Sequence, residues 1–161
     1  MIVVIMGVTG SGKTVVGSRL AEQLGWEFTD ADNFHSPANK EKMSRGIGLT
    51  DAERTPWLKT IHDAMLKWQA EKQNSVLACS ALKHTYREIL RQNVEAKFVY
   101  LRGSAEFIQS RLAHRSGHYA TASLLESQFA ALEEPHDALV VEINHTPEEI
   151  VEEIRKKLFL A

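Results

Sequence analysis

The chain has 161 residues, of which 43% are hydrophobic, and a formal net charge of −2. This length is enough for one compact domain with a sizeable core, and the charge argues against a surface built for nucleic acid or anionic membrane. A single cysteine, Cys79, excludes an intramolecular disulfide framework, and the first apolar run is too short for a signal sequence. We therefore expect a cytoplasmic domain without a nucleic-acid or membrane partner.

Apolar runs and segments of helical period alternate along the first half of the chain. Residues 2–6 are a continuous apolar run, as in a buried strand, and residues 13–24 have the period of a helix. A short second strand is predicted at 26–29. A long helix is predicted at 51–71, behind a threonine that can cap its N-terminus. The stretch between them, residues 33–49, is predicted to be irregular.

The second half continues the same alternation. Strands are predicted at 75–79, 98–101 and 138–143, and a last helix at 147–158 begins with a proline, which a first helical turn tolerates. Such alternation is typical of an α/β fold, in which helices cover both faces of a parallel sheet, here one of five strands. A second irregular stretch at 114–120 is a candidate lid.

Residues 7–14 form a phosphate-binding motif. They match G-x-x-x-x-G-K-[ST] between a predicted strand and helix, and are Gly7, Val8, Thr9, Gly10, Ser11, Gly12, Lys13 and Thr14. Glycines let backbone N–H groups face phosphate oxygens, the lysine adds positive charge, and the threonine hydroxyl can bind Mg²⁺. We therefore predict ATP and Mg²⁺ as cofactors. A dinucleotide-binding motif fits poorly, because its third glycine position holds Val15.

Two carboxylates, Asp30 and Asp32, directly follow the second predicted strand. Ligands of such sheets bind beyond the carboxyl ends of the strands, and in extended chain side chains two residues apart face the same way. We expect one of them to help hold Mg²⁺ and the other to accept a hydrogen bond or a proton from the substrate hydroxyl; of the two possible assignments we take Asp30 for the metal and Asp32 for the substrate, and a solvated acidic turn is the alternative to both. The third strand ends in Ser80 and not in the aspartate of a Walker B strand, which favours a small-metabolite kinase.

Cations gather in two further places. Lys83 and Arg87 follow the third strand one helical turn apart, where they can contact an anionic substrate or simply lie on a helix surface. Arg111 and Arg115 lie in or beside the candidate lid, where an arginine can stabilise the transferred phosphoryl group. We predict that Arg115 is catalytic and that Arg111 binds the nucleotide; the alternative is a basic helix end.

Two short motifs stand out, namely D-A-D-N-F-H at residues 30–35 and C-S-A-L-K at residues 79–83. In these motifs the chain resembles the gluconokinase family. Further matches run along nearly the whole chain, among them P-W-L at 56–58 and S-Q-F at 127–129. The resemblance implies the three-layer, nucleoside-monophosphate-kinase-like P-loop fold shared with shikimate kinase, phosphoryl transfer from ATP to the 6-hydroxyl of D-gluconate, and often a homodimer.

The resemblance also implies a substrate segment at about residues 33–58 and a lid at about 111–121 of a single domain spanning 1–161. A sugar acid asks for cations around its carboxylate and for small polar partners around its hydroxyls. The residues predicted to bind it are Asp32, His35, Asn39, Arg54, Ser80, Lys83 and Arg87. The predicted catalytic residues are Lys13, Asp32 and Arg115.

Two other functions stay open. A shikimate kinase would share the phosphate loop, the paired carboxylates and the arginine lid, but we expect a glycine cluster in place of residues 79–83. A nucleotide-binding module without chemistry would not need both carboxylates and the lid arginines. An ADP-release assay over several acceptors separates these functions.

Overall fold

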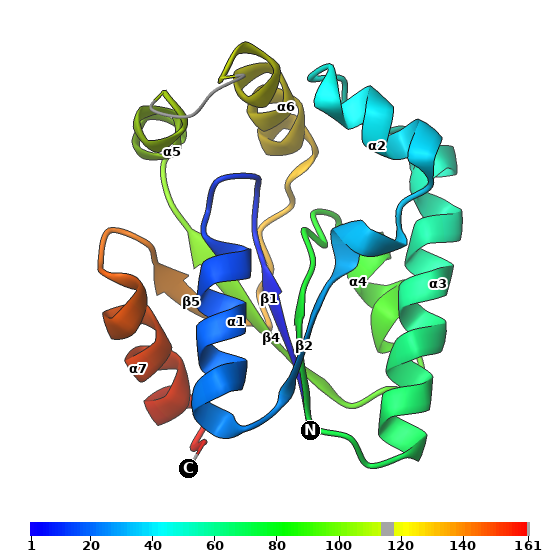
Figure 1. Ribbon diagram of the computed structural model, residues 1–161, viewed down its shortest axis with the longest axis vertical. Coiled ribbons are helices and arrows are strands. Elements are labelled where there is room, and N and C mark those ends of the chain that lie inside the picture. The colour runs from blue at the N-terminus through cyan, green and yellow to red at the C-terminus, as the bar shows by residue number, and fades with distance from the viewer. Residues whose placement is uncertain (114–117, 161) are drawn as a thin grey trace.

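The computed structural model describes residues 1–113 and 118–160, the latter beginning with four residues described by backbone alone. Five parallel strands form one sheet in the order β2-β3-β1-β4-β5, with helices on both faces (Figure 1). The strands are β1 Ile2–Met6, β2 Glu27–Asp30, β3 Ser75–Ala78, β4 Ala96–Arg102 and β5 Leu139–Glu142. The predicted three-layer α/β fold with a five-stranded parallel sheet is confirmed.

The helices complete the two outer layers and cover the carboxyl edge of the sheet (Figure 1). They are α1 Lys13–Leu24, the 3-10 turn η1 Ala31–Phe34, α2 Pro37–Ser44, α3 Asp51–Ala70, α4 His84–Arg91, α5 Ala105–Leu112, α6 His118–Ala131 and α7 Pro147–Lys157. Helices α1 and α7 pack on one face, and α3 and α4 on the other. Within the described residues, no helix is both long and apolar enough to cross a bilayer.

The sheet separates two hydrophobic clusters, and β1 contributes to both. Val3 and Ile5 pack toward α1 and α7, whereas Ile2, Val4 and Met6 pack toward α3 and α4. All five side chains are buried. A strand covered on both faces needs apolar residues at every position, which explains the unbroken apolar run in the sequence. This run places β1 at the centre of the sheet, between β3 and β4.

Helix α2 lies inside the stretch that the sequence pattern predicted to be irregular, so that prediction was wrong. The Ser36 hydroxyl accepts a hydrogen bond from the Asn39 N–H at 3.1 Å, and Pro37 occupies the first helical turn. These are ordinary helix-start signals. The helix buries none of its residues, so it has no apolar period by which the sequence could reveal it.

Arg87 stabilises the loops at the carboxyl edge of the sheet. Its side chain is only 2% exposed, and it donates to the Ala81 carbonyl at 2.7 Å and to the Glu133 carbonyl at 2.9 Å. Ala81 lies in the loop after β3 and has a positive φ of 44°, a conformation that costs energy for a residue with a Cβ. Arg87 therefore ties this strained loop to the end of α6.

We predict that Arg87→Leu lowers the free energy of unfolding by about 2–4 kcal/mol, because the buried Ala81 carbonyl and the part-buried Glu133 carbonyl lose their donor. Chemical denaturation of the purified variant measures this loss, with Arg45→Leu, at the exposed residue that follows α2, as matched control. A loss below about 0.5 kcal/mol, together with weaker binding of the acceptor, would instead return Arg87 to the substrate-binding role predicted from the sequence.

Candidate active site

The loop between β1 and α1 has the geometry of a phosphate cradle. A Cβ at Gly7 would lie 2.7 Å from the Ser11 hydroxyl and 3.0 Å from the Leu101 carbonyl. The loop therefore has room only for glycine at position 7. Gly12, with φ of 98°, starts α1 in the left-handed region. The Ser11 hydroxyl is buried and has no hydrogen-bond partner in the described chain. An orphaned donor beside a helix N-terminus fits a bound phosphate group.

Lys13 begins α1 and reaches back over the loop, where its ammonium group donates to the Val8 carbonyl at 3.0 Å. Desolvation lowers the pKa of Lys13, while the negative charge of Asp32 opposes that shift. Thr14 follows, and its hydroxyl donates to one carboxylate oxygen of Asp30 at 3.0 Å. The P-loop lysine and the proposed Mg²⁺ residues therefore lie together at the carboxyl ends of β1 and β2.

The side chains of Asp30 and Asp32 do not project side by side from one strand, as the sequence suggested they would. Strand β2 ends at Asp30, and Asp32 lies in the 3-10 turn η1, so the expectation that both side chains project from extended chain was wrong. The Asp30 carboxylate instead caps this turn by accepting from the Asp32 N–H at 3.0 Å. Asp30 is thereby held toward Thr14, while Asp32 faces a separate pocket.

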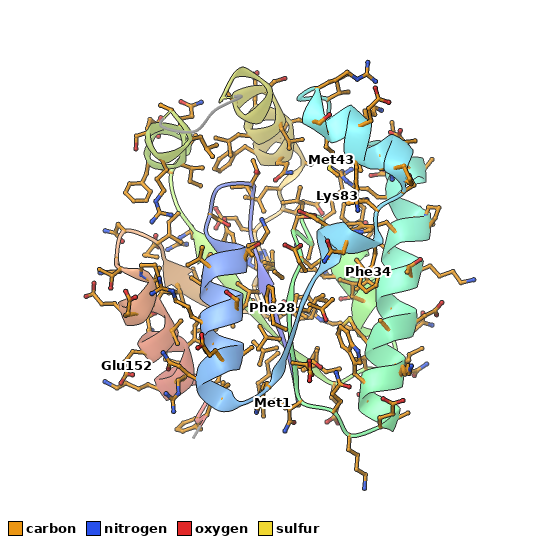
Figure 2. The ribbon with its side chains drawn as sticks, in the orientation of Figure 1. Met1, Phe28, Phe34, Met43, Lys83 and Glu152 are labelled. Carbon is orange, nitrogen blue, oxygen red and sulfur yellow. The ribbon has the colours of Figure 1, made fainter. Side chains whose placement is uncertain are left out.

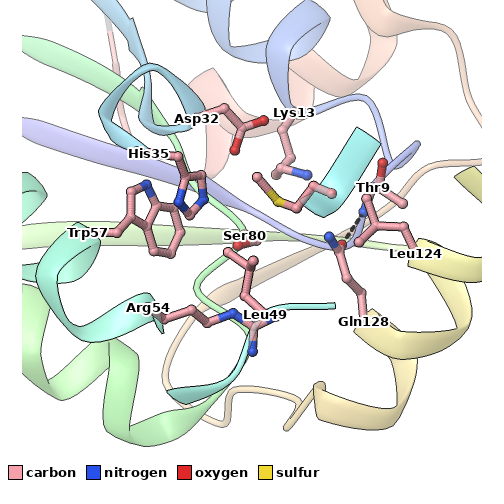
Figure 3. Close-up of a pocket in the computed structure, with 11 residues that line it drawn as sticks. Thr9, Lys13, Asp32, His35, Leu49, Arg54, Trp57, Ser80, Leu124 and Gln128 are labelled. Carbon is pink, nitrogen blue, oxygen red and sulfur yellow. Dashed lines mark hydrogen bonds between the residues drawn. The ribbon is translucent and has the colours of Figure 1, made fainter. Parts of the chain in front are cut away.

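Asp32 lines this pocket beside Lys13 of the phosphate loop (Figure 3). Asp32 as a residue is exposed, but the protein atoms around its carboxyl group partly desolvate it. This desolvation, followed by repulsion from Asp30, raises the pKa of Asp32, and the attraction of Lys13 only partly offsets the shift. A carboxylate with a raised pKa is a better proton acceptor than an ordinary one.

The pocket measures about 70 Å³ and draws its walls from both halves of the chain (Figure 3). Its lining residues are Thr9, Lys13, Asp32, His35, Met43, Leu49, Arg54, Trp57, Ser80, Leu124 and Gln128. They come from the phosphate loop and the start of α1, η1 and the residue after it, α2, the segment before α3, α3, the loop after β3, and α6. Six of the predicted site residues, namely Thr9, Lys13, Asp32, His35, Arg54 and Ser80, are brought together here.

His35 and Trp57 form a stacked pair in this wall. Their ring centroids are 4.2 Å apart with planes inclined by 11°, and the indole N–H of Trp57 donates to the Ala31 carbonyl at 2.7 Å. Desolvation, with the positive charges of Arg54 and Lys40, lowers the pKa of His35 to about 4. His35 is therefore neutral near pH 7, with a buried Nδ1 that has no partner within the described chain.

Arg54 is a buried cation on the same helix as Trp57, nearly one turn before it (Figure 3). It is 7% exposed, and one guanidinium nitrogen donates to the Tyr86 hydroxyl at 3.0 Å. The Tyr86 hydroxyl in turn donates to Asp51, whose carboxylate also accepts from Lys83 at 3.0 Å. This series of hydrogen bonds fixes the orientation of the Arg54 guanidinium, whose planar fork suits a carboxylate.

Other predicted residues lie outside the pocket walls. Lys83 is engaged with Asp51, and Arg87 with two backbone carbonyls, as described above. Asn39 donates to the Glu53 carbonyl at 3.1 Å and so joins α2 to α3. Arg115 lies outside the described residues. We accordingly treat Lys83, Arg87 and Asn39 as supports around the site.

Arg111 borders a second cavity on the other flank of the phosphate loop. This cavity measures about 400 Å³ and is lined by Gly10, Ser11, Gly12, Val15, Val16, Arg111, Pro147 and Ile150. The guanidinium of Arg111 lies 4.9 Å from the centroid of the Phe107 ring and approaches Gly12. Its position beside the loop suits a nucleotide whose phosphates lie in the cradle.

The sequence did not single out Gln128 or the apolar residues of the pocket. Gln128 lies on α6, and its side-chain oxygen accepts from the Thr9 N–H of the phosphate loop at 2.6 Å. Met43, Leu49 and Leu124 supply apolar wall. The only signal for Gln128 was its place in the S-Q-F match at residues 127–129.

Comparison with known proteins agrees with this geometry. A family model described as shikimate kinase matches residues 9–159. A probable gluconokinase of Xenopus tropicalis is 48% identical over 151 residues, covering 84% of this chain and 80% of its own. The crystal structure of a sugar kinase from Janibacter superposes with a TM-score of 0.92 at 43% identity, covering 99% of this chain and 95% of that one.

The crystal structure of a gluconokinase from Sinorhizobium meliloti superposes with a TM-score of 0.82 at 37% identity. The alignment covers 98% of this chain and 94% of that one. All three comparisons thus match most or nearly all of the chain. They agree on one group of kinases. The chain belongs to the gluconokinase family, within the shikimate-kinase group of P-loop kinases.

Proposed function

We infer that this protein is a gluconokinase, which transfers the terminal phosphoryl group of ATP to gluconate to give 6-phosphogluconate. The observation that carries this conclusion is one pocket that joins Lys13 of the phosphate loop to Asp32 and to the buried cation Arg54. A pocket of this kind offers a base for a hydroxyl at one place and a partner for a carboxylate at another. Relatives named gluconokinase match most of the chain, which supports the same acceptor.

The chemistry is an in-line displacement at phosphorus. An acceptor hydroxyl oxygen forms the new bond to the γ-phosphorus, the bond to the β,γ-bridging oxygen breaks, and ADP leaves. Asp32 accepts the hydroxyl proton, and Lys13 with the loop N–H groups stabilises charge on the phosphate oxygens. Most of the rate enhancement then comes from positioning and electrostatics, which pre-formed side chains supply.

We propose that Thr14 and Asp30 bind Mg²⁺ together with nucleotide oxygens and water. Their side chains are already joined at 3.0 Å, and both offer oxygen, the ligand type that Mg²⁺ prefers. In the described chain, no three His, Cys, Asp or Glu side chains form a metal-binding group, so phosphate and water must complete the shell. When bound, the ion would neutralise charge on the transferred phosphoryl group.

The acceptor carboxylate is assigned to Arg54, and its hydroxyls to Asp32, Ser80 and neutral His35. A cavity of about 70 Å³ holds roughly two waters, less than a six-carbon acid fills. Met43 and Leu124 are flexible apolar side chains in its wall and can turn aside when the acceptor enters. Gluconate binding should therefore enlarge the pocket by moving side chains, without changing the sheet.

The resemblance to the family also leads us to propose a cytoplasmic homodimer. In the same way we propose that residues 111–121 act as a lid that carries Arg115 to the transferred phosphoryl group, with Arg111 on the nucleotide. Sedimentation of the purified protein tests the dimer. A monomer at all concentrations would contradict it.

We predict that gluconate is phosphorylated at least about a hundredfold more efficiently, by kcat/KM, than shikimate, glucose or AMP. A site with buried polar groups rejects molecules that leave those groups unpaired. The measurement is ADP release with each acceptor at saturating MgATP. Shikimate is the serious competitor, because the matching family model carries its name. If shikimate or AMP outran gluconate, the substrate assignment would be wrong and the kinase assignment would stand.

We predict that Asp32→Asn lowers kcat at least about a hundredfold and leaves the KM for ATP within about twofold, because only the proton acceptor is lost. Because burial and Asp30 raise the pKa of Asp32, wild-type kcat/KM should fall as the pH decreases through that raised pKa. The variant should lack this acid limb. The exposed Asp63→Asn of α3 is the matched control, and an unchanged kcat in Asp32→Asn would refute the role.

The same substitution gives a stability readout. The native pKa of Asp32 lies above its ordinary value of 3.8, so ionisation costs native-state stability, and the full cost applies above the native pKa. Asp32→Asn removes that charge and should unfold at pH 7 at the same or a higher temperature than the wild type. A variant that is both inactive and much less stable would point to a structural role instead.

A further inference from the structure

Gln128 is the residue that joins α6 to the phosphate loop. Its side chain is 8% exposed, and its oxygen accepts from the Thr9 N–H at 2.6 Å (Figure 3). A carboxamide has one acceptor end and one donor end. Because the N–H of Thr9 can only donate, this contact fixes which end of Gln128 is the oxygen and leaves the NH₂ group as the end that can serve another partner.

Helix α6 holds Gln128 in place from its other side as well. Gly48, in the segment before α3, packs so closely on α6 that a Cβ there would lie 1.9 Å from the Ser127 hydroxyl. Leu124, one helical turn before Gln128, lines the same pocket. Helix α6 thus rests on the phosphate loop and on the substrate segment, and its position between α5 and α2 is visible in Figure 1.

The charges of the pocket leave a place for a neutral donor. Lys13 and Arg54 are cations, Asp32 is an anion, and His35 is neutral with a pKa of about 4. Gln128 is bonded to the phosphate loop itself, so its NH₂ group lies near the end of the pocket where phosphoryl transfer occurs. A neutral donor at this end suits a hydroxyl oxygen better than a carboxylate, which Arg54 already serves.

We propose that Gln128 determines acceptor specificity by donating its NH₂ group to a hydroxyl oxygen near the reacting end of the acceptor, while its own oxygen is held by Thr9. The proposal rests on the proposed function and adds Gln128 to the residues that bind the acceptor in that pocket. It also gives a physical link between acceptor and phosphate loop, because the residue that would bind the hydroxyl also accepts a hydrogen bond from the loop. Among the side chains drawn in Figure 2, Met43 of α2 is labelled at the substrate side of this region. Such double anchoring keeps the donor pre-organised.

Gln128→Glu separates the two ends of the side chain. Glutamate keeps an oxygen for the Thr9 N–H and loses the NH₂ donor, whereas Gln128→Met loses both. The exposed Gln109→Glu of α5 is the control for added charge. We expect Gln128→Glu to keep its melting temperature and a KM for ATP within about twofold, and to lose at least about tenfold in kcat/KM for gluconate.

Deoxygluconates then show whether the donor touches the acceptor. In the wild type, loss of the 4- or 5-hydroxyl should lower kcat/KM about tenfold or more, and in Gln128→Met one of these two losses should disappear. The loss caused by removing the distant 2-hydroxyl should be the same in both proteins. Since this comparison uses ratios within each protein, it does not depend on the added charge of Gln128→Glu.

Equal losses in wild type and Gln128→Met for both the 4- and 5-deoxy acceptors would overturn the proposal. So would a rise confined to the KM for ATP, which would mean that Gln128 serves only the phosphate loop. If Gln128→Met does not fold, Gln128→Asn, which shortens the reach, carries the same comparison. Wild-type turnover of gluconate is measured first; if another sugar acid is used instead, the proposed function fails, and the deoxy forms of that acid test Gln128.

Discussion

The site depends on the central position of β1. Because β1 lies between β3 and β4 and is buried on both faces, the glycine-rich loop after it starts from a rigid point in the middle of the carboxyl edge. Parallel strands end at the same edge, so the loop, the turn after β2 and the segment after β3 meet there. The phosphate cradle, the carboxylates and Ser80 are neighbours for this one reason.

At Lys13 and Asp32, the proposed function and the stability of the fold make opposite demands. Desolvation lowers the pKa of Lys13 and raises that of Asp32, and each shift disfavours the charged form that the proposed mechanism needs. The surrounding fold must supply the free energy to hold them there. Hydrogen bonds from buried side chains contribute to this free energy. Arg87 donates to two backbone carbonyls, and the indole N–H of Trp57 donates to the turn that carries Asp32.

Much of this arrangement could be predicted from the sequence, because its signals are local. The phosphate loop, the apolar run of β1 and the long amphipathic α3 each carry their own pattern. Helix α2 could not, since a helix with no buried face has no period. The engagement of Lys83 by Asp51 and the Gln128 contact with Thr9 depend on tertiary approach of distant segments, for which a single sequence has no local signal.

The central claim is that one pocket holds the acceptor between Asp32 and Arg54, with its reacting end at the phosphate loop. The most direct measurement is a crystal structure with gluconate and a non-hydrolysable ATP analogue. We expect the 6-hydroxyl at about 3 Å from the Asp32 carboxylate and the gluconate carboxylate on Arg54. Gluconate bound with its carboxylate toward the phosphate loop, or outside this pocket, would contradict the account.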